Sequence, residues 1–355
     1  MVSAHDGQLP DDDGTARGRA DAALRRAVYY LDRGFAASGK VRAFTHARAV
    51  VDGLDDAELE RLVRTGTLTD LDGIGPSTGS VIADAVTGTP SAYLARLEAD
   101  TRVEAVEGSA VRGALRGDLH SHTTWSDGAE SIRAMATAAA ALGHEYLAVT
   151  DHSARLTVAH GLDESRLADQ LAEVAVLNME LAPFRILTGM EVDILEDGTL
   201  DLSADMLARL DVVVASVHSK LAMEPREMTR RMVMAVADPT VDVLGHCTGR
   251  KVTGRGRAPS RFDADIVFAA CARFDTAVEI NCRPERRDPP RELLDLAIEW
   301  GCKVSIDTDA HAPGQLEWQP WGCDVAVDAD LAVESIVNTW PADDLLSWAG
   351  NHPTG

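Results

Sequence analysis

The segment GDLHSHTTWSDG concentrates side chains that can bind a metal ion. Alternate residues of a β-strand project to the same side, so Asp118, His120 and His122 are expected to share one face. Two imidazoles at this spacing can hold one metal ion. The segment DTDAH repeats the device with Asp309 and His311. Either pair alone gives weak support, because a single histidine is more often a core or surface residue.

Residues of these types recur at the ends of most of the predicted strands. The candidate metal ligands are His120, His122, Asp127, His152, Glu191, His218, His246, Asp309 and His311. Imidazole and carboxylate without thiolate suit Zn, Mn or Fe, and this set is too large for one ion. The pattern therefore predicts a cluster of two or three divalent metal ions, which typically serves phosphoester hydrolysis.

The elements that must position these ligands begin near Leu115, where short β-branched runs start to alternate with helical patterns. Seven runs are expected to be strands: GALRGDLH, YLAVTDH, ILTGMEVD, VVVASVH, VDVLGH, AVEIN and VSIDTDAH. This alternation predicts parallel strands joined by right-handed crossovers, in an open sheet or a closed barrel. Polar residues at six strand ends favour the barrel, because the carboxyl ends of barrel strands all face one mouth.

The preceding part of the chain has a helical pattern. We expect a disordered acidic tail over residues 1–16, a helical domain over 17–107 and the barrel over 113–355. The segment LTDLDGIGPSTGSVIADAVTG predicts a helix, a tight turn and a second helix, and it resembles a helix-hairpin-helix motif. The turn residues Gly73, Ile74 and Gly75 are candidate DNA-binding residues, since their amides and the next helix N-terminus can bind a phosphate. A hairpin that only packs between domains is the alternative.

Composition limits the possible partners. The 355 residues carry a net charge of -23, which disfavours non-specific binding to nucleic acid. Residues 17–50 are an exception, with eight Lys/Arg and two acidic residues. The five cysteines form no C-x-x-C, and no apolar run has the length of a membrane span. These features predict a reduced, cytoplasmic protein with no membrane partner, and they leave the oligomeric state open.

The motifs together resemble the PHP (polymerase and histidinol phosphatase) superfamily of metal-dependent phosphoesterases. The matching segments, in family order, are DLHSHTTWSDG, VTDHS, GMEVDI, SVHSK, GHCTGR, EINCRP and SIDTDAH. Within the superfamily, VAHGL, GHCTGR and DTDAH are most similar to the PHP domain of bacterial family X DNA polymerases. The resemblance implies a distorted seven-stranded β/α barrel with a trinuclear site.

The resemblance also assigns the ligands to three ions. His120, His122, Glu191 and Asp309 would hold the first ion. Glu191 would bridge to a second ion held by His218 and His246. Asp127, His152 and His311 would hold the third. Cys247 stands where a proline is usual and His160 where an asparagine is common, but neither change removes a ligand.

Four further residues are candidates for supporting roles in catalysis. Asp118 and Asp151 are interpreted as partners that orient imidazoles. Lys220 and Arg250 follow ligands closely and are candidates for gripping a phosphate, with a basic loop after Arg250 extending the grip. Exposed loop charges are an equally good interpretation of the basic residues.

The N-terminal segment resembles the small N-terminal domain of family X polymerases. No room remains for a nucleotidyl-transfer domain, so the chain is not expected to synthesise DNA. A nuclease or phosphoesterase that acts on DNA ends is the first functional hypothesis, covering 3'-5' exonuclease, 3'-phosphatase and abasic-site activities in repair. A phosphatase of small phosphomonoesters, such as histidinol phosphate or nucleotides, is the second. A non-enzymatic scaffold is a third, against which the complete ligand set argues.

Overall fold

The computed structural model describes residues 13–353, which form two compact units. The first unit extends to Val103 and includes Pro313–Gln315, and the second comprises Glu104–Ala312 and the residues from Leu316 onward. Most of the predicted tail, residues 1–12, lies outside the described residues. Within the described part, none of the helices combines the length and the apolar character that crossing a membrane requires.

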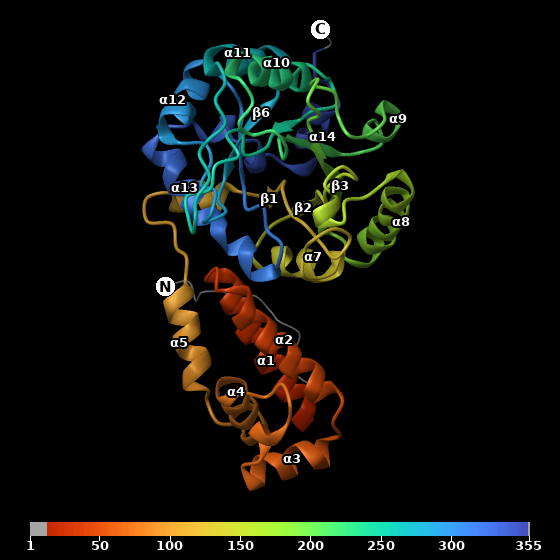
Figure 1. Cartoon of the computed structure of the whole chain (residues 1–355), viewed down its shortest axis with the longest axis vertical. Coiled ribbons are helices and arrows are strands. Elements are labelled where there is room, and N and C mark those ends of the chain that lie inside the picture. Colours follow the sequence, from red (N-terminus) through yellow and green to blue (C-terminus); the bar gives the residue numbers. More distant parts are fainter. Residues whose placement is uncertain (1–12, 354–355) are drawn as a thin grey trace. The chain divides into compact units, whose positions relative to one another are not determined.

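The first unit is entirely helical (Figure 1). Its elements are α1 (Ala16–Arg33), α2 (Ser38–Asp52), α3 (Asp56–Thr65), the 3-10 turn η1 (Leu68–Asp70), α4 (Pro76–Thr87) and α5 (Ala92–Thr101). Helix α1 packs against α2, α4 and α5 around buried Leu24, Phe44 and Ile82. This core is apolar, and burial of such side chains is sufficient to hold the helices together.

The segment around the Gly73 turn differs from the prediction in one respect. The expected helix before the turn is only the three residues of η1. The cause is Gly66, which ends α3 in the left-handed conformation at φ 68° and leaves too few residues for another helix. Gly73 itself has φ 86°, and a Cβ there would lie 2.2 Å from the His46 ring, so the turn requires glycine.

The second unit is an α/β barrel of seven parallel strands (Figure 1). The strands are β1 (Gly117–Asp118), β2 (Tyr146–Val149), β3 (Arg185–Asp193), β4 (Val212–Ser216), β5 (Val243–Leu244), β6 (Ala277–Asn281) and β7 (Val304–Asp307). Each strand pairs with the next one along the chain. The predicted seven-stranded barrel fold is confirmed.

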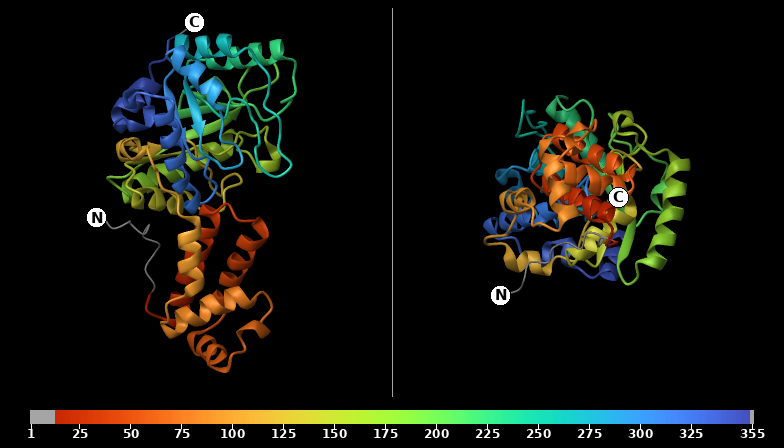
Figure 2. Two further views of the ribbon diagram at one scale, coloured as in Figure 1. Left: turned by 90° about the vertical axis from the view of Figure 1, so that its left-hand side faces the viewer. Right: turned by 90° about the horizontal axis from the view of Figure 1, so that it is seen from below.

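Helices surround the strands (Figure 2, left view). They are α6 (Ser109–Ala114), α7 (Ile132–Ala141), η2 (Thr157–Ala159), α8 (Glu164–Glu180), α9 (Ala204–Leu207), α10 (Pro225–Val236), α11 (Ala264–Phe274), α12 (Arg291–Glu299), η3 (Pro313–Trp318), α13 (Gln319–Asp328), η4 (Val333–Ser335), η5 (Val337–Thr339) and α14 (Ala342–Ala349). Alternate strand residues face opposite sides, so Leu147 and Val149 pack with α7 and α8, whereas Ala148 packs with Leu187 and Val214 of other strands.

The barrel is nearly closed between its first and last strands. Ser121 and Ala310 form an isolated parallel bridge just beyond β1 and β7, and the His122 amide donates to the Ala310 carbonyl at 2.7 Å. The Leu119 amide donates to the Asp307 carboxylate at 2.8 Å. The seam therefore joins the two segments that carry the H-x-H and D-x-H motifs, and it brings residues almost 190 positions apart into contact.

Candidate metal centre

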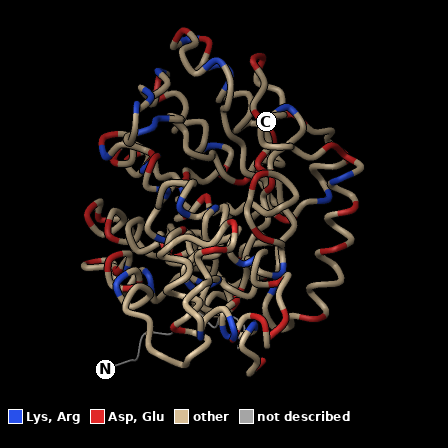
Figure 3. Tube along the Cα trace, turned by 60° about the horizontal axis from the view of Figure 1, so that its bottom comes forward, with Lys and Arg blue, Asp and Glu red and all other residues tan. Residues whose placement is uncertain are grey.

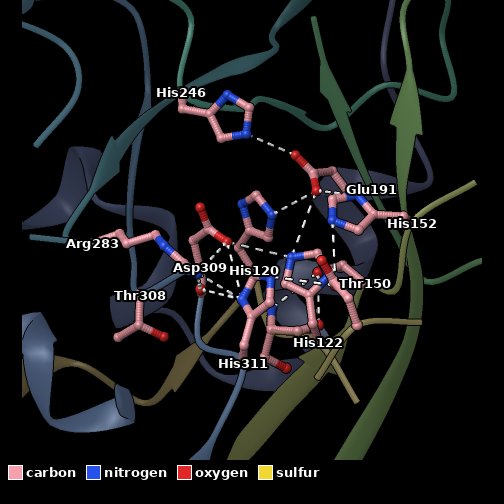
Figure 4. A network of polar contacts seen from close by, with 12 residues as sticks. His120, His122, Thr150, His152, Glu191, His246, Arg283, Thr308, Asp309 and His311 are labelled. Carbon is pink, nitrogen blue, oxygen red and sulfur yellow. Dashed lines mark hydrogen bonds and ion pairs between the residues drawn. The ribbon is translucent and has the colours of Figure 1, made fainter. Parts of the chain in front are cut away.

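Nine polar side chains converge at the carboxyl ends of the barrel strands, and Figure 4 labels most of them. They are the predicted candidates His120, His122, Asp127, His152, Glu191, His218, His246, Asp309 and His311. Strand β1 ends at Asp118, so His120 and His122 lie just beyond it, yet their ring centroids are only 5.2 Å apart. The two imidazoles therefore face the same space, as the spacing predicts, although the strand is shorter than expected.

Glu191, which lies inside β3, is the centre of the cluster. Its carboxylate oxygens lie within 3.6 Å of nitrogens of His120, His122, His152, His218 and His246. Burial alone would raise the pKa of the Glu191 carboxyl, but His218 and His120 hold it well below its ordinary value. The residue is therefore a carboxylate, and it faces imidazoles on several sides.

Potential ligand atoms fall into three groups whose members lie within 4.8 Å of one another. The groups are His122, Asp127, His152 and His311; His120, His122 and Asp309; and His152, Glu191 and His218. Compared with the predicted assignment, His122 and His152 each belong to two groups. His246 belongs to none of them, but its Nε2 lies 2.8 Å from the Glu191 carboxylate. The groups share members, which is the arrangement expected for neighbouring ions that share ligands.

The donor atoms of this cluster fit divalent metal ions. Among the described residues, several buried imidazole nitrogens have no hydrogen-bond partner: Nε2 of His120, Nδ1 and Nε2 of His122 and His218, Nδ1 of His152 and Nδ1 of His246. A buried polar atom without a partner costs about 1–3 kcal/mol, so this many would be expensive in an empty protein. Nitrogen and oxygen donors without sulfur suit Zn, Mn or Fe.

Two carboxylates lie behind the cluster, on the outer side of its imidazoles, and the sequence did not reveal either. Glu279, in β6, is fully buried with its Oε1 2.6 Å from His120 Nδ1. Asp193, at the end of β3, lies 3.5 Å from His218 Nδ1. A carboxylate at Nδ1 favours the tautomer with the proton there, which leaves Nε2 free to bind a metal. The apolar neighbours of Glu279 in AVEIN were the available signal, because an acid in a buried strand needs a partner.

Among the residues that the structure describes, Asp118 and Asp151 make no hydrogen bond or ion pair with an imidazole ring, which differs from the predicted role. Asp118 accepts hydrogen bonds from the His120 amide at 3.1 Å and the Thr308 hydroxyl at 2.5 Å. Burial and the neighbouring Asp307 raise the pKa of Asp118 well above its ordinary value. Asp151 instead accepts from the hydroxyls and amides of Thr123 and Ser126 and from the Gln170 amide group. Both carboxylates position ligand-bearing backbone rather than rings.

The basic residues nearest the cluster are not Lys220 and Arg250, which were predicted to grip a phosphate. Among residues 13–353, the exposed side chain of Lys220 makes no hydrogen bond or ion pair, and the guanidinium of Arg250 donates to the carbonyls of Arg286 and Arg287. Arg283 lies 3.4 Å and Arg286 2.9 Å from the two oxygens of Asp309. Burial alone would raise the pKa of Asp309, but these two arginines hold it well below its ordinary value.

The predicted DNA-binding turn differs from the metal centre because most of its amide groups have hydrogen-bond partners within the unit. The Ile74 side chain is buried, and its amide donates to the Leu71 carbonyl at 3.2 Å. The Gly75 amide donates to the Thr78 hydroxyl at 2.9 Å. Two of the three turn amides therefore have partners inside the unit, and the role of the turn in DNA binding stays a prediction.

A parallel barrel that gathers histidines and carboxylates at its mouth is an arrangement in which metal ions can be bound. Residues 118–281 match the family model described as the PHP domain. This chain therefore contains a PHP domain over these residues.

Similar proteins fall into two kinds. The DNA polymerase/3'-5' exonuclease PolX of Bacillus subtilis (strain 168) is 46% identical over 199 residues, which are 56% of this chain and 35% of that protein. A probable phosphatase of Thermoanaerobacter sp. (strain X514) is 29% identical over 206 residues, 55% of this chain and 78% of that protein. This chain thus spans about a third of the length of the Bacillus relative.

Among solved structures, a histidinol phosphate phosphatase from Lactococcus lactis subsp. lactis Il1403 aligns with a TM-score of 0.44 and 19% identity. The alignment covers 61% of this chain and 94% of that one.

Proposed function

We propose that this protein hydrolyses phosphoester bonds at DNA ends with a cluster of two or three Zn, Mn or Fe ions. The observation that carries the proposal is the convergence of nine imidazole and carboxylate side chains at the barrel mouth, with buried nitrogens that have no hydrogen-bond partner in the described structure. The activities that fit are a 3'-5' exonuclease, a 3'-phosphatase or an abasic-site activity of the kind used in repair.

The proposed ligand sets are those predicted from the sequence motifs, and the distances between donor atoms agree with them in part. One ion would be held by His120, His122 and Asp309, with Glu191 completing the set. A second would be held by Glu191, His218 and His246, and a third by Asp127, His152 and His311. When bound, such ions polarise a phosphoryl oxygen and lower the pKa of a bound water.

The chain's own residues complete the site around the ions. Glu279 contacts Nδ1 of His120 at 2.6 Å, which keeps its Nε2 aimed at the centre, and Asp193 lies beside Nδ1 of His218 at 3.5 Å. Arg283 and Arg286 place two fixed positive charges beside Asp309. Guanidinium groups suit a phosphate oxygen both in charge and in geometry, so these two arginines are better placed for that role than Lys220.

Substrates larger than a simple phosphate have a place to bind near the centre. A cavity of about 500 Å³ is lined by Trp125, His160 and Arg166 and by Ser126, the neighbour of Asp127. This volume lies in the range of ligand pockets. An aromatic ring in its wall suits a nucleobase, although an imidazole-bearing monoester would fit as well.

The choice of DNA as substrate is supported by the similarity to the Bacillus exonuclease. The acidic net charge and the probable phosphatases among the relatives support the second candidate, a phosphatase of small phosphomonoesters. The deciding experiment compares four substrates with Mn and with Zn: single-stranded DNA with a 3'-hydroxyl, the same strand with a 3'-phosphate, histidinol phosphate and a nucleoside monophosphate. A kcat/KM that is highest for either DNA end supports the proposal. A preference for both small monoesters, with no DNA cleavage, overturns it.

A further inference from the structure

The strongest positive charge on the barrel lies in one loop next to the metal centre. Residues 250–261 contain Arg250, Lys251, Arg255, Arg257 and Arg261 and no acidic residue. The chain as a whole carries 57 acidic against 34 basic residues, and Figure 3 shows acidic and basic residues interspersed over the trace. A run of five cations is therefore unusual for this chain.

This loop is an ordered hairpin. The backbones of Lys251 and Arg257 exchange two hydrogen bonds, of 3.0 and 2.8 Å, and a turn closes between Thr253 and Gly256. The Val252 amide donates to the Glu285 carbonyl at 2.7 Å, which attaches the hairpin to the loop after β6. The hairpin therefore presents its side chains from a defined backbone, although every residue from 252 to 259 is exposed.

The hairpin is continuous with the metal centre. It begins a few residues after His246, and the Arg250 guanidinium donates to the carbonyl of Arg286 at 3.1 Å. The Arg286 side chain in turn lies 2.9 Å from the Asp309 carboxylate. A row of positive charge thus leads from a candidate metal ligand to the hairpin. An extended strand rises about 3.3 Å per residue, so the hairpin reaches roughly 13 Å beyond Gly249.

Several cations of the basic segment at residues 17–50 have partners within the helical unit. There, Arg25 and Arg48 pair with Asp21, Arg33 donates to the Glu98 carbonyl and Arg19 donates to the Val86 carbonyl. Several of these charges already serve packing within the helical unit. In the hairpin, Lys251 pairs with Glu285 at 3.2 Å and Arg257 donates to the Gly249 carbonyl at 2.7 Å. Among the described residues, the exposed side chains of Arg255 and Arg261 make no hydrogen bond or ion pair.

We infer that the hairpin of residues 249–258, together with Arg261, binds the phosphate backbone of a single DNA strand whose end lies at the metal centre. The inference rests on the proposed function. It places the residues that bind the DNA strand on the barrel rather than on the helical unit. Residues 249–261 contain no aromatic side chain for stacking on bases, so the contact is to phosphates and has no sequence preference. The left-handed Gly254 and Gly256 let a phosphate approach the backbone closely.

The test is a full-length double variant, Arg255→Gln with Arg261→Gln, assayed on a single-stranded oligonucleotide. The matched control is Arg209→Gln with Arg273→Gln, two exposed arginines that precede β4 and β6 and so lie at the opposite end of the barrel. Both variants lose two positive charges. For each protein, kcat and KM are measured on DNA over a range of salt, and on a small chromogenic phosphoester as reference.

We expect KM for DNA to rise about 5-fold at low salt in the hairpin variant, since exposed contacts are individually weak. The slope of log KM against log salt should fall by about 1.4, because each phosphate contact to a single strand contributes about 0.7. The control should keep the wild-type KM and slope. If the hairpin variant matches the control while wild-type protein cleaves DNA, the inference fails and the proposed function stands. If wild-type protein cleaves no DNA but hydrolyses monoesters, the proposed function fails and the inference with it.

Discussion

The barrel mouth and the Gly73 turn are both candidate binding sites, but their polar groups differ in whether they have hydrogen-bond partners. At the mouth, His120 and His122 are fully buried, and several of their nitrogens lack hydrogen-bond partners among the described residues. At the turn, the amides of Ile74 and Gly75 donate to acceptors inside the same unit. Unmatched buried donors and acceptors favour a ligand at the mouth, whereas two of the three turn amides have partners without one, and the role of the turn in DNA binding stays a prediction.

The difference implies that the two units depend on metal to different extents. Ions that bind the folded barrel and not the unfolded chain stabilise it by mass action. The helical unit has an apolar core and no comparable cluster among its described residues. We therefore expect the metal to control both activity and stability in the barrel alone.

Removal of metal should have the largest effect. Protein treated with a chelator and then freed of it should lose almost all phosphoesterase activity, and its barrel should unfold at a lower temperature. Added Mn or Zn should restore both properties. Elemental analysis of untreated protein should find more than one equivalent of metal per chain. Full activity in a metal-free preparation would contradict the expectation that the barrel depends on metal and the helical unit does not.

The substitution Glu191→Gln should come next. Glu191 contacts five imidazoles, and loss of its charge should weaken the binding of two ions at once. Loss of a group behind a ligand typically costs 10–100-fold, so we expect more than about 100-fold loss of kcat/KM. Lys220→Ala is the comparison, with a smaller effect that falls mainly on KM. Hydrolysis at the wild-type rate by the Glu191 variant would show that the proposed ligand set is wrong.

Glu279→Gln should have a smaller effect that is specific to the centre. An amide at this position no longer favours the His120 tautomer with its proton on Nδ1, so metal affinity should fall by about 10–100-fold. Titration of metal-free protein with Mn measures this. Glu145→Gln, at the amino end of β2, is the matched control and should bind Mn as the wild type does. Equal affinities for all three proteins would exclude the tautomer role.

The smallest effect is expected from glycine substitutions in the helical unit, measured as a change in the free energy of unfolding. Two positions distinguish the cost of a left-handed backbone from the cost of a side-chain clash. Gly73 and Gly88 both have positive φ, but only at Gly73 would a Cβ meet a neighbouring side chain, that of His46. A left-handed alanine costs about 1–2 kcal/mol, so Gly88→Ala should lower the free energy of unfolding by that amount. Gly73→Ala should lower it further, as measured by denaturant titration. A larger loss at Gly88 would contradict the packing interpretation of the turn.

The sequence was sufficient to predict the strand order and the convergence of the nine polar side chains, because strand ends in a parallel barrel meet at one mouth. The sequence was insufficient for side chains whose hydrogen-bond or ion-pair partners come from distant strands. Asp118 was expected at an imidazole, but it bonds the Thr308 hydroxyl, a contact that exists only once β1 and β7 are adjacent. Glu279 and Arg286 were missed for the same reason, since their partners His120 and Asp309 lie elsewhere in the chain.

The seam between β1 and β7 has a consequence for how the protein is made. Contacts between residues this far apart in sequence form late, because a long loop must close before they can contribute. The first and last ligand-bearing segments meet at this seam, so a growing chain has no complete set of ligands until His311 has been synthesised and the barrel has closed. Capture of metal at this centre then marks the end of folding, and incompletely synthesised chains remain without the full cluster.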